Sequence, residues 1–324
     1  RDSREDDLVL CTFTGGASAL TPALHPEIPL ADMQRLTCML LECGATIHEI
    51  NTLRKHLSRF SGGSLVRAAF PATVLGLIVS DVVGDDLDVI ASGPTVPDPS
   101  TFADCLRVVE HYGLRWKMPQ SIWAHIEGGL QGRTPETPKA DEPAFGRVRN
   151  VLVASVKQAL EAAADEAARC GFVPRILTTA MSGEARRTAE QLVAEARRAQ
   201  AGLRPGDAPL CLLAGGETTV TIRGSGKGGR NQEMALAATL ELADDRGIDL
   251  ICVGTDGTDG PTDAAGGYAF SGDLARLRAI GLHPKESLDA NDSYPLLLKA
   301  GTLLRTGPTR TNVMDMAIML VRPK

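Results

Sequence analysis

The chain has 324 residues, of which 43% are hydrophobic and 23% are charged, a balance typical of a globular protein of about two domains. Its net charge of −6 gives no overall basic field that could hold nucleic acid or an anionic membrane. The longest apolar runs, such as residues 74–79, are far shorter than the roughly 20 residues of a membrane-spanning helix, so a soluble protein with neither kind of partner is expected.

The seven cysteines and six histidines show no spacing typical of a metal site. The cysteines are scattered and include no Cys-x-x-Cys pair, which favours reduced thiols and a cytoplasmic location. The histidines lie apart along the chain, so structural or surface roles are expected for them. The chain has no initiator methionine and opens on a charged run at 1–7, which indicates a cut or processed end.

The amino-terminal part predicts a strand, a turn and then a helix. Residues 8–14 form an apolar run typical of a buried strand, and small residues at 15–18 predict a turn directly after it. Thr46 and Glu49 match a capping box, so a helix is expected to begin there.

This helix would carry Asn51, Arg54 and Lys55 on one face, because residues three and four positions apart lie together on a helix. An amide and two cations could bind an anionic ligand. Taken alone, however, the pattern favours an ordinary solvated face.

Residues 73–79 predict the next apolar strand, which runs into an acidic loop at 80–86. Helices are expected to follow, up to about residue 129. Residues 131–146 are rich in proline, threonine and charge, so they predict an exposed connection and are the best candidate for a linker.

From residue 148 onward, predicted strands and helices alternate in the pattern of a parallel sheet. The series is strand 148–154, helix 156–170, strand 173–178, helix 184–201, strand 210–214, helix 231–243, strand 249–253 and helix 272–280. An exposed loop is expected at 202–208, and a short β segment at 218–222.

Four predicted strands run into loops rich in glycine or aspartate, at 15–18, 81–86, 215–217 and 254–263. In open parallel sheets, ligands bind beyond the carboxyl ends of the strands. The last loop places three carboxylates among glycines and threonines. Mg²⁺ prefers oxygen ligands of this kind, although a series of Asp-Gly turns without any ligand has the same composition.

Residues 224–229 match G-x-G-x-x-G before a helix, a weak nucleotide-binding signal that a plain loop explains at least as well. Lys227 and Arg230 add positive charge beside the helix amino terminus, where backbone amides also favour an anion. Since an arginine in an exposed cleft supports little core packing, the fold is expected to survive replacement of Arg230. Nucleophile-elbow and P-loop motifs are absent from the sequence, which argues against hydrolases and P-loop enzymes.

Seven stretches, in order along the chain, resemble class II glycerate kinases, the family with a MOFRL domain. They lie at 15–20, 44–58, 80–85 with 90–95, 214–217, 228–233, 254–257 and 311–315. The resemblance implies an α/β fold, with a Rossmann-like amino-terminal domain at 1–201, a carboxy-terminal α/β MOFRL domain at 209–324, and an active-site cleft between them.

Two departures from the family accompany this resemblance. Ala17 stands where relatives carry a third glycine. Relatives also have a preceding segment with a Gly-Lys-Ala lysine assigned to catalysis, and this sequence lacks it, so the amino-terminal domain is expected to be incomplete here.

The resemblance implies that ATP, with Mg²⁺, phosphorylates glycerate, and it favours 2-phosphoglycerate as the product. Phosphoryl transfer needs positioning, charge neutralisation and a group that orients the attacking hydroxyl. Asp81 would be that group, as a base or a hydrogen-bond acceptor, and Arg230 would hold the substrate carboxylate or the transferring phosphoryl. Asp256 and Asp259 would hold Mg²⁺, directly or through water.

The other expected site residues would contact substrate or nucleotide. Lys55 would be a catalytic residue, together with Asp81 and Arg230, and would face the substrate. The binding residues would be Gly15, Gly16, Ser18, Asn51, Glu217, Lys227 and Asn231.

The sequence leaves two alternatives open. Some relatives carry the name hydroxypyruvate reductase, which would require NAD(P)H and gives no use for the aspartate-rich loops. A non-catalytic binding protein would follow if the amino-terminal lysine were absent from the gene. A homodimer is only the commonest default for a protein of this kind.

Overall fold

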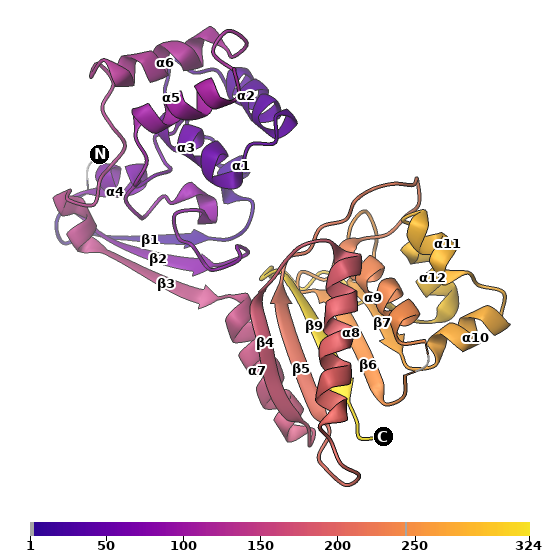
Figure 1. Cartoon of the computed structure of the whole chain (residues 1–324). Helices are drawn as coiled ribbons and strands as arrows, with labels where there is room; N and C mark the ends of the chain where they lie inside the picture. The colour runs from indigo at the N-terminus through magenta and orange to yellow at the C-terminus, as the bar shows by residue number, and fades with distance from the viewer. Residues whose placement is uncertain (1–2, 244) are drawn as a thin grey trace. The chain divides into compact units, whose positions relative to one another are not determined.

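The computed structural model describes residues 3–243 and 245–324, so Arg1 and Asp2 of the charged opening run lie outside it. The chain divides into two compact units (Figure 1). The first comprises the chain up to Ser80 together with Asp85–Val153, and the second comprises Asp81–Gly84 together with Ala154–Lys324. The main division, between residues 153 and 154, lies earlier in the chain than the domain boundary expected at 201–209. The reason is that the strand Val173–Met181 and the helix Ala185–Ala201 belong to the second unit.

The first unit combines a three-stranded sheet with a group of helices. The strands, in sheet order, are β1 (Leu8–Phe13), β2 (Thr73–Val79) and β3 (Val148–Ala154), and β1 runs parallel to β2 with Leu8 beside Thr73. The helices are α1 (Ala17–Leu20), α2 (Leu30–Glu42), α3 (Ile47–Leu57), α4 (Ser64–Ala69), α5 (Phe102–His111) and α6 (Gln120–Leu130), with short 3₁₀ turns at Ile90–Ser92 and Pro143–Arg147. Because β1 and β2 are parallel, the loops that follow them lie at the same edge of the sheet.

Helices α2, α3, α5 and α6 enclose the hydrophobic core of this unit, where Leu36, Leu53, Cys105 and Ile122 are completely buried. Helix α3 begins where the sequence predicts. The Thr46 side chain accepts a hydrogen bond from the Glu49 amide, and the Glu49 carboxylate accepts one from the Thr46 amide.

The second unit contains a six-stranded sheet in which most neighbouring strands are antiparallel. Its order is β4 (Val173–Met181), β5 (Leu210–Gly216), β9 (Asp315–Val321), β6 (Ile248–Gly254), β7 (Gly266–Phe270) and β8 (Leu303–Leu304). Only β4 and β5 pair in parallel, so the expectation of a parallel sheet is wrong for the remaining pairs. Strands β5 and β6 still run in the same direction, as the alternating pattern predicts, but β9 lies between them and runs antiparallel to both.

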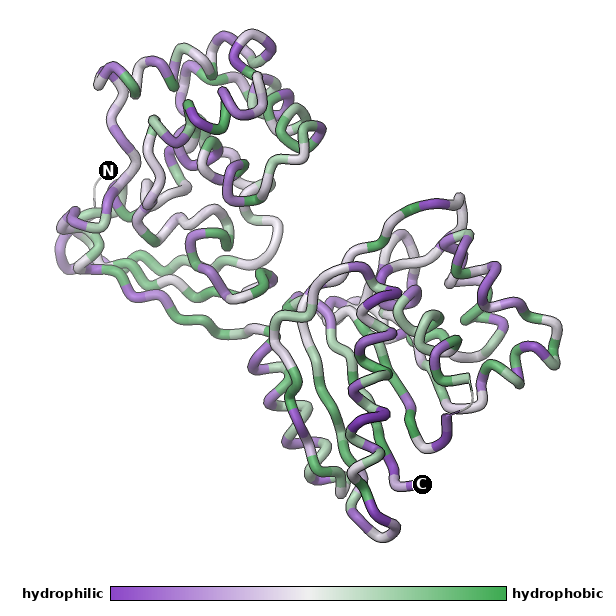
Figure 2. The backbone as a smooth tube through the Cα atoms, in the orientation of Figure 1, coloured by the Kyte–Doolittle hydropathy of each residue, from purple (hydrophilic) through white to green (hydrophobic). Residues whose placement is uncertain are grey.

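Helices cover both faces of this sheet (Figure 1). They are α7 (Val156–Arg169), α8 (Ala185–Ala201), α9 (Arg230–Glu241), α10 (Asp273–Ala279), α11 (Pro284–Asp289) and α12 (Ser293–Ala300). Along β5, Leu212 and Ala214 pack in the core formed with α8 and α9, whereas Cys211 and Leu213 pack in the core formed with α7. Strand β5 is buried along its whole length, and Figure 2 shows it as predominantly hydrophobic. In α8, by contrast, hydrophilic and hydrophobic stretches alternate.

Three loop predictions have different outcomes. Residues 202–208 are exposed except for the half-buried Leu203, as expected. Residues 131–146 are mostly accessible, but they join α6 to β3 within the first unit and bury Thr137, whose hydroxyl donates to Asp98 at 3.0 Å. The β segment expected at 218–222 is wrong, since only Thr219 forms an isolated bridge, to Glu184. In the described residues, no helix has the length and apolar character needed to cross a membrane.

Candidate active site

Arg230 stands at the centre of the polar residues that the second unit gathers. It is the first residue of α9, and it donates to Asp315 through Nε at 2.6 Å and through Nη2 at 3.1 Å. Its Nη1 donates to Glu217. These bonds use three of the five guanidinium N–H groups, so one on Nη1 and one on Nη2 are left to meet a ligand.

The sheet topology explains how residues distant in sequence meet here. Strand β9 begins at Asp315, which pairs with Gly216 at the end of β5 on one side and with Gly254 at the end of β6 on the other. The carboxyl ends of two strands therefore flank the amino end of a third. Asp315 was missed as a site residue, although it closes the last stretch of family resemblance at 311–315.

Burial and charge set the protonation of this group. The side chain of Asp315 is 1% exposed, and its burial raises the pKa of the carboxyl against the opposing effect of the Arg230 guanidinium. Burial would lower the pKa of Arg230, but hydrogen bonds and charge from Asp315 and Glu217 raise it. The arginine therefore stays charged and is held in one orientation between two carboxylates.

Asp81 belongs to the same compact unit. Burial raises the pKa of its carboxyl, and the negative charge of Glu217 adds to that increase. A raised pKa makes a carboxylate a better proton acceptor near neutral pH. The role of base expected for Asp81 stays a prediction.

Asp259 has a different role from the metal ligand expected. Its Oδ1 accepts the Asn231 amide at 3.1 Å, and its Oδ2 accepts the Gln232 amide at 2.8 Å and the Gln232 side chain at 2.9 Å. Asp259 therefore caps α9, and it occupies the backbone amides that were expected to bind an anion. Asn231, which is buried, supports this cap and does not line the neighbouring cavity.

Asp256 is the better candidate for a cation. Within the described part of the chain, its two carboxylate oxygens accept hydrogen bonds only from the Thr258 amide and hydroxyl, both at 2.9 Å, which leaves lone pairs for a cation. Asp256, Glu217 and Arg230 all line a cavity of about 670 Å³, a volume within the range of small-molecule sites.

The glycine run at 224–229 makes a close contact within the protein. A side chain at Gly224 or Gly226 would collide with the backbone of Ala290, and one at Gly229 would collide with Asp259. These glycines are thus required by packing, which is the plain-loop alternative. Lys227 is exposed, and its Nζ lies 4.6 Å from the centre of the Tyr294 ring, so the structure does not place it among the residues that line the cavity.

The first unit holds the other expected residues. Ser92 donates to Asn51 Oδ1 at 3.0 Å and contacts the Ser18 hydroxyl at 2.9 Å. Lys55 is buried and paired with Asp88 and Asp98, so its charge is already neutralised rather than free for a substrate. Gly15 and Gly16 follow β1 in the loop, and Gly16 adopts a left-handed φ of 78° directly before α1.

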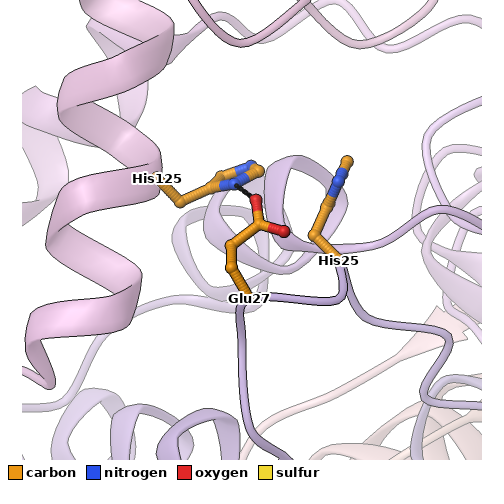
Figure 3. Close-up of side chains that lie close together, drawn as sticks. All are labelled: His25, Glu27 and His125. Atoms are coloured by element: carbon orange, nitrogen blue, oxygen red, sulfur yellow. Dashed lines mark hydrogen bonds and ion pairs between the residues drawn. The ribbon is translucent and has the colours of Figure 1, made fainter.

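One histidine cluster contradicts the expectation that the histidines do not assemble. The ligand atoms of His25, Glu27 and His125 lie within 4.8 Å of one another, with the Glu27 carboxylate between the two rings (Figure 3). His125 faces Glu27 through Nδ1 at 2.8 Å and the His56 carbonyl through Nε2 at 2.9 Å. Each ring nitrogen of His125 thus faces an oxygen of the protein, so contacts within the protein account for the cluster.

Comparison with known proteins gives consistent results along the chain. Residues 1–127 match a model described as a domain of unknown function (DUF4147), and residues 210–315 match the MOFRL family. A glycerate 2-kinase of Pyrococcus horikoshii is 46% identical over 323 residues, covering 99% of this chain and 72% of that protein.

Two further matches bear on the alternatives. The crystal structure of a glycerate kinase from Thermotoga maritima has a TM-score of 0.90 at 43% identity and covers 99% of this chain and 74% of that one. A putative hydroxypyruvate reductase of Agrobacterium vitis is 44% identical over 318 residues, covering 98% of this chain and 70% of that protein.

Proposed function

The chain belongs to the glycerate kinase family with DUF4147 and MOFRL domains, and we propose that it transfers a phosphoryl group from ATP to the 2-hydroxyl of glycerate. Phosphorylation of glycerate follows from the family. The choice of the 2-hydroxyl rests on relatives whose names specify a 2-kinase.

The geometry of Arg230 carries the proposal. Enzymes that transfer phosphoryl groups work mainly by positioning and by neutralising charge on the transferring group. A guanidinium fixed by Asp315 and Glu217, with two N–H groups left to donate, is suited to both tasks. A lysine could not reproduce this arrangement, because it lacks the planar fork.

We assign Asp81 the role of orienting the substrate hydroxyl and accepting its proton. Asp256 has the oxygen donors that a hard cation prefers and would hold Mg²⁺, which neutralises phosphate charge when bound. Asp259 is not assigned to the metal, because its oxygens already accept hydrogen bonds from α9.

The reductase alternative loses its one sequence signal. In a dinucleotide-binding loop, glycines let the backbone approach the pyrophosphate. Here the backbone of Ala290 packs against Gly224 and Gly226, so these glycines make room for the protein itself and not for a pyrophosphate.

The test is an assay of the purified chain with ATP, Mg²⁺ and D-glycerate, in which enolase detects 2-phosphoglycerate directly. We expect enolase-competent product, and kcat about 10²-fold lower in Arg230→Lys. Product that enolase accepts only after a mutase is added would refute the 2-hydroxyl assignment. NADH oxidation with hydroxypyruvate, without ATP turnover, would favour the reductase.

A further inference from the structure

The two cations on helix α3 have very different surroundings. Lys55 is buried against Asp88 and Asp98. Arg54 is half-buried, and no hydrogen bond or ion pair joins it to any residue within 3–243 and 245–324. Burial lowers the pKa of Arg54, and no carboxylate offsets that effect. The guanidinium donors of this half-buried arginine are therefore free to bind an anion from outside the protein.

Arg54 lines a cavity of about 350 Å³ within the first unit. Hydroxyl groups share the lining with it, including Ser58, Ser61 and Ser92, and Leu24 and Met33 supply apolar surface. This volume is at the lower end of the range for ligand sites, which suits a small molecule rather than a nucleotide.

The hydroxyls around the cavity offer both a donor and an acceptor. Ser58 Oγ accepts the amides of Phe60 and Ser61, each at 3.1 Å, so its proton remains to be donated. Ser92 donates to Asn51, so the Ser92 contact with Ser18 uses the Ser18 proton and leaves the Ser18 oxygen as an acceptor. A donor beside an acceptor matches an alcohol group.

The backbone that presents Ser92 is strained. Ala91 and Ser92 have φ values of 54° and 59°, in the left-handed region that residues with a side chain rarely adopt. Such strain persists where the surrounding structure enforces it, and it gathers at binding sites. Here the strained segment includes Ser92, which lines the cavity together with Arg54 and contacts the Ser18 hydroxyl.

We propose that this cavity binds a small hydroxycarboxylate, with the guanidinium of Arg54 gripping the carboxylate and Ser18 and Ser58 meeting a hydroxyl. In glycerate this would be the 3-hydroxyl, because the 2-hydroxyl is assigned to Asp81. Only the choice of glycerate as the natural ligand rests on the proposed function. A planar guanidinium matches both oxygens of a carboxylate, which explains an arginine at this position.

Isothermal titration of the whole chain, without nucleotide, tests the site. D-glycerate should bind, whereas glycerol and methyl glycerate, which lack the carboxylate charge, should not. Arg54→Ala should weaken binding about 100-fold and Arg54→Lys about tenfold, because a lysine keeps the charge and loses the fork. Arg35→Ala removes an exposed arginine of α2 from the same unit and should leave the affinity unchanged.

Glycerol that binds as tightly as glycerate, Arg54→Ala affinity within twofold of wild type, or no detectable binding of glycerate would overturn the site. If Arg54→Ala fails to fold in a thermal melt, Arg54→Lys and the ester comparison decide the question. Binding that depends on Arg54 in a chain without kinase activity would refute the proposed function and keep the site. Phosphorylation of glycerate with an unchanged KM in Arg54→Lys would refute the site and keep the proposed function.

Discussion

Replacing Arg230 by alanine should destabilise the second unit as well as impair catalysis. The sequence alone suggests that the fold tolerates this change, whereas the contacts of Arg230 in the structure predict a loss of stability. Arg230 is the charged partner of Asp315, whose side chain is 1% exposed. In Arg230→Ala, a buried carboxylate would lose two hydrogen bonds and its counter-charge.

The expected loss is about 3–5 kcal/mol, the usual cost of leaving a buried charge unpaired. For a unit of this size the melting temperature should fall by about 6–20 °C. Urea denaturation at pH 7 and a thermal melt measure both quantities. The deficit should shrink as the pH falls, because the orphaned Asp315 carboxyl can take up a proton and lose its charge.

Two variants separate this explanation from a general loss of packing. Arg230→Ala combined with Asp315→Asn should recover about 2 kcal/mol relative to Arg230→Ala, since no buried charge remains. Glu217→Gln removes the charge of the other partner of Arg230. Because the Glu217 side chain is 45% exposed, this change should lower the free energy of unfolding by at most about 1 kcal/mol. An Arg230→Ala protein within 1 kcal/mol of wild type, or a double variant no more stable than the single one, would refute the reasoning.

Three other outcomes follow from the charges. Asp81→Asn should lower kcat by about 10²–10⁴-fold with little change in KM, and the raised pKa of Asp81 should place the acid limb of the wild-type rate profile above the pH at which an ordinary aspartate titrates. Asp256→Asn should raise the Mg²⁺ concentration needed for half-maximal rate about tenfold. Bonds from His56 and two backbone amides overcome burial and hold the pKa of Glu136 at about 2, so Glu136→Gln should cost stability above pH ~5 and cost progressively less as the pH falls toward 2. Because the Glu136 side chain is 36% exposed, the effect at pH 7 should be screened to about 1–2 kcal/mol, measured by urea denaturation.

Each of these has a clear contrary result. Asp165, exposed on α7, provides the control for removing a carboxylate charge, and Asp165→Asn should match wild type in rate and Mg²⁺ requirement. An Asp81→Asn enzyme as fast as that control would exclude Asp81 as the base. A Mg²⁺ requirement unchanged in Asp256→Asn would exclude it as a ligand, and a Glu136→Gln deficit that persists at pH 2 would locate its cause elsewhere than in the carboxylate.

Local signals predict local structure well in this chain. The capping box at Thr46 and the apolar run 73–79 involve neighbours in sequence, and the helix and strand they indicate are present. The arrangement of the second sheet depends on β9, which joins it from far along the chain. Because helix and strand periodicity are properties of single segments, they cannot reveal which strands become neighbours.

The site shows the same limit at the level of side chains. The sequence places Asp256 and Asp259 in one loop with the same local chemistry. In the structure, however, Asp259 accepts hydrogen bonds from the Asn231 and Gln232 amides at the amino terminus of α9. Lys55 and Arg54 are adjacent, yet only Lys55 meets carboxylates. Which charge is satisfied depends on contacts between distant residues, and no spacing rule includes them.

The insertion of β9 also bears on how the second unit assembles during synthesis. Strands β5 and β6 each pair with β9 over seven positions, so the ladder that joins the two halves of the sheet cannot form until residues 315–321 have left the ribosome. The first unit has no such dependence on the last strand and can fold earlier, as amino-terminal units generally do. Until then, β5 and β6 would expose unpaired edges at the place where Arg230 later meets Asp315. A nascent chain is therefore vulnerable to aggregation at the point where the finished protein gathers its functional charges.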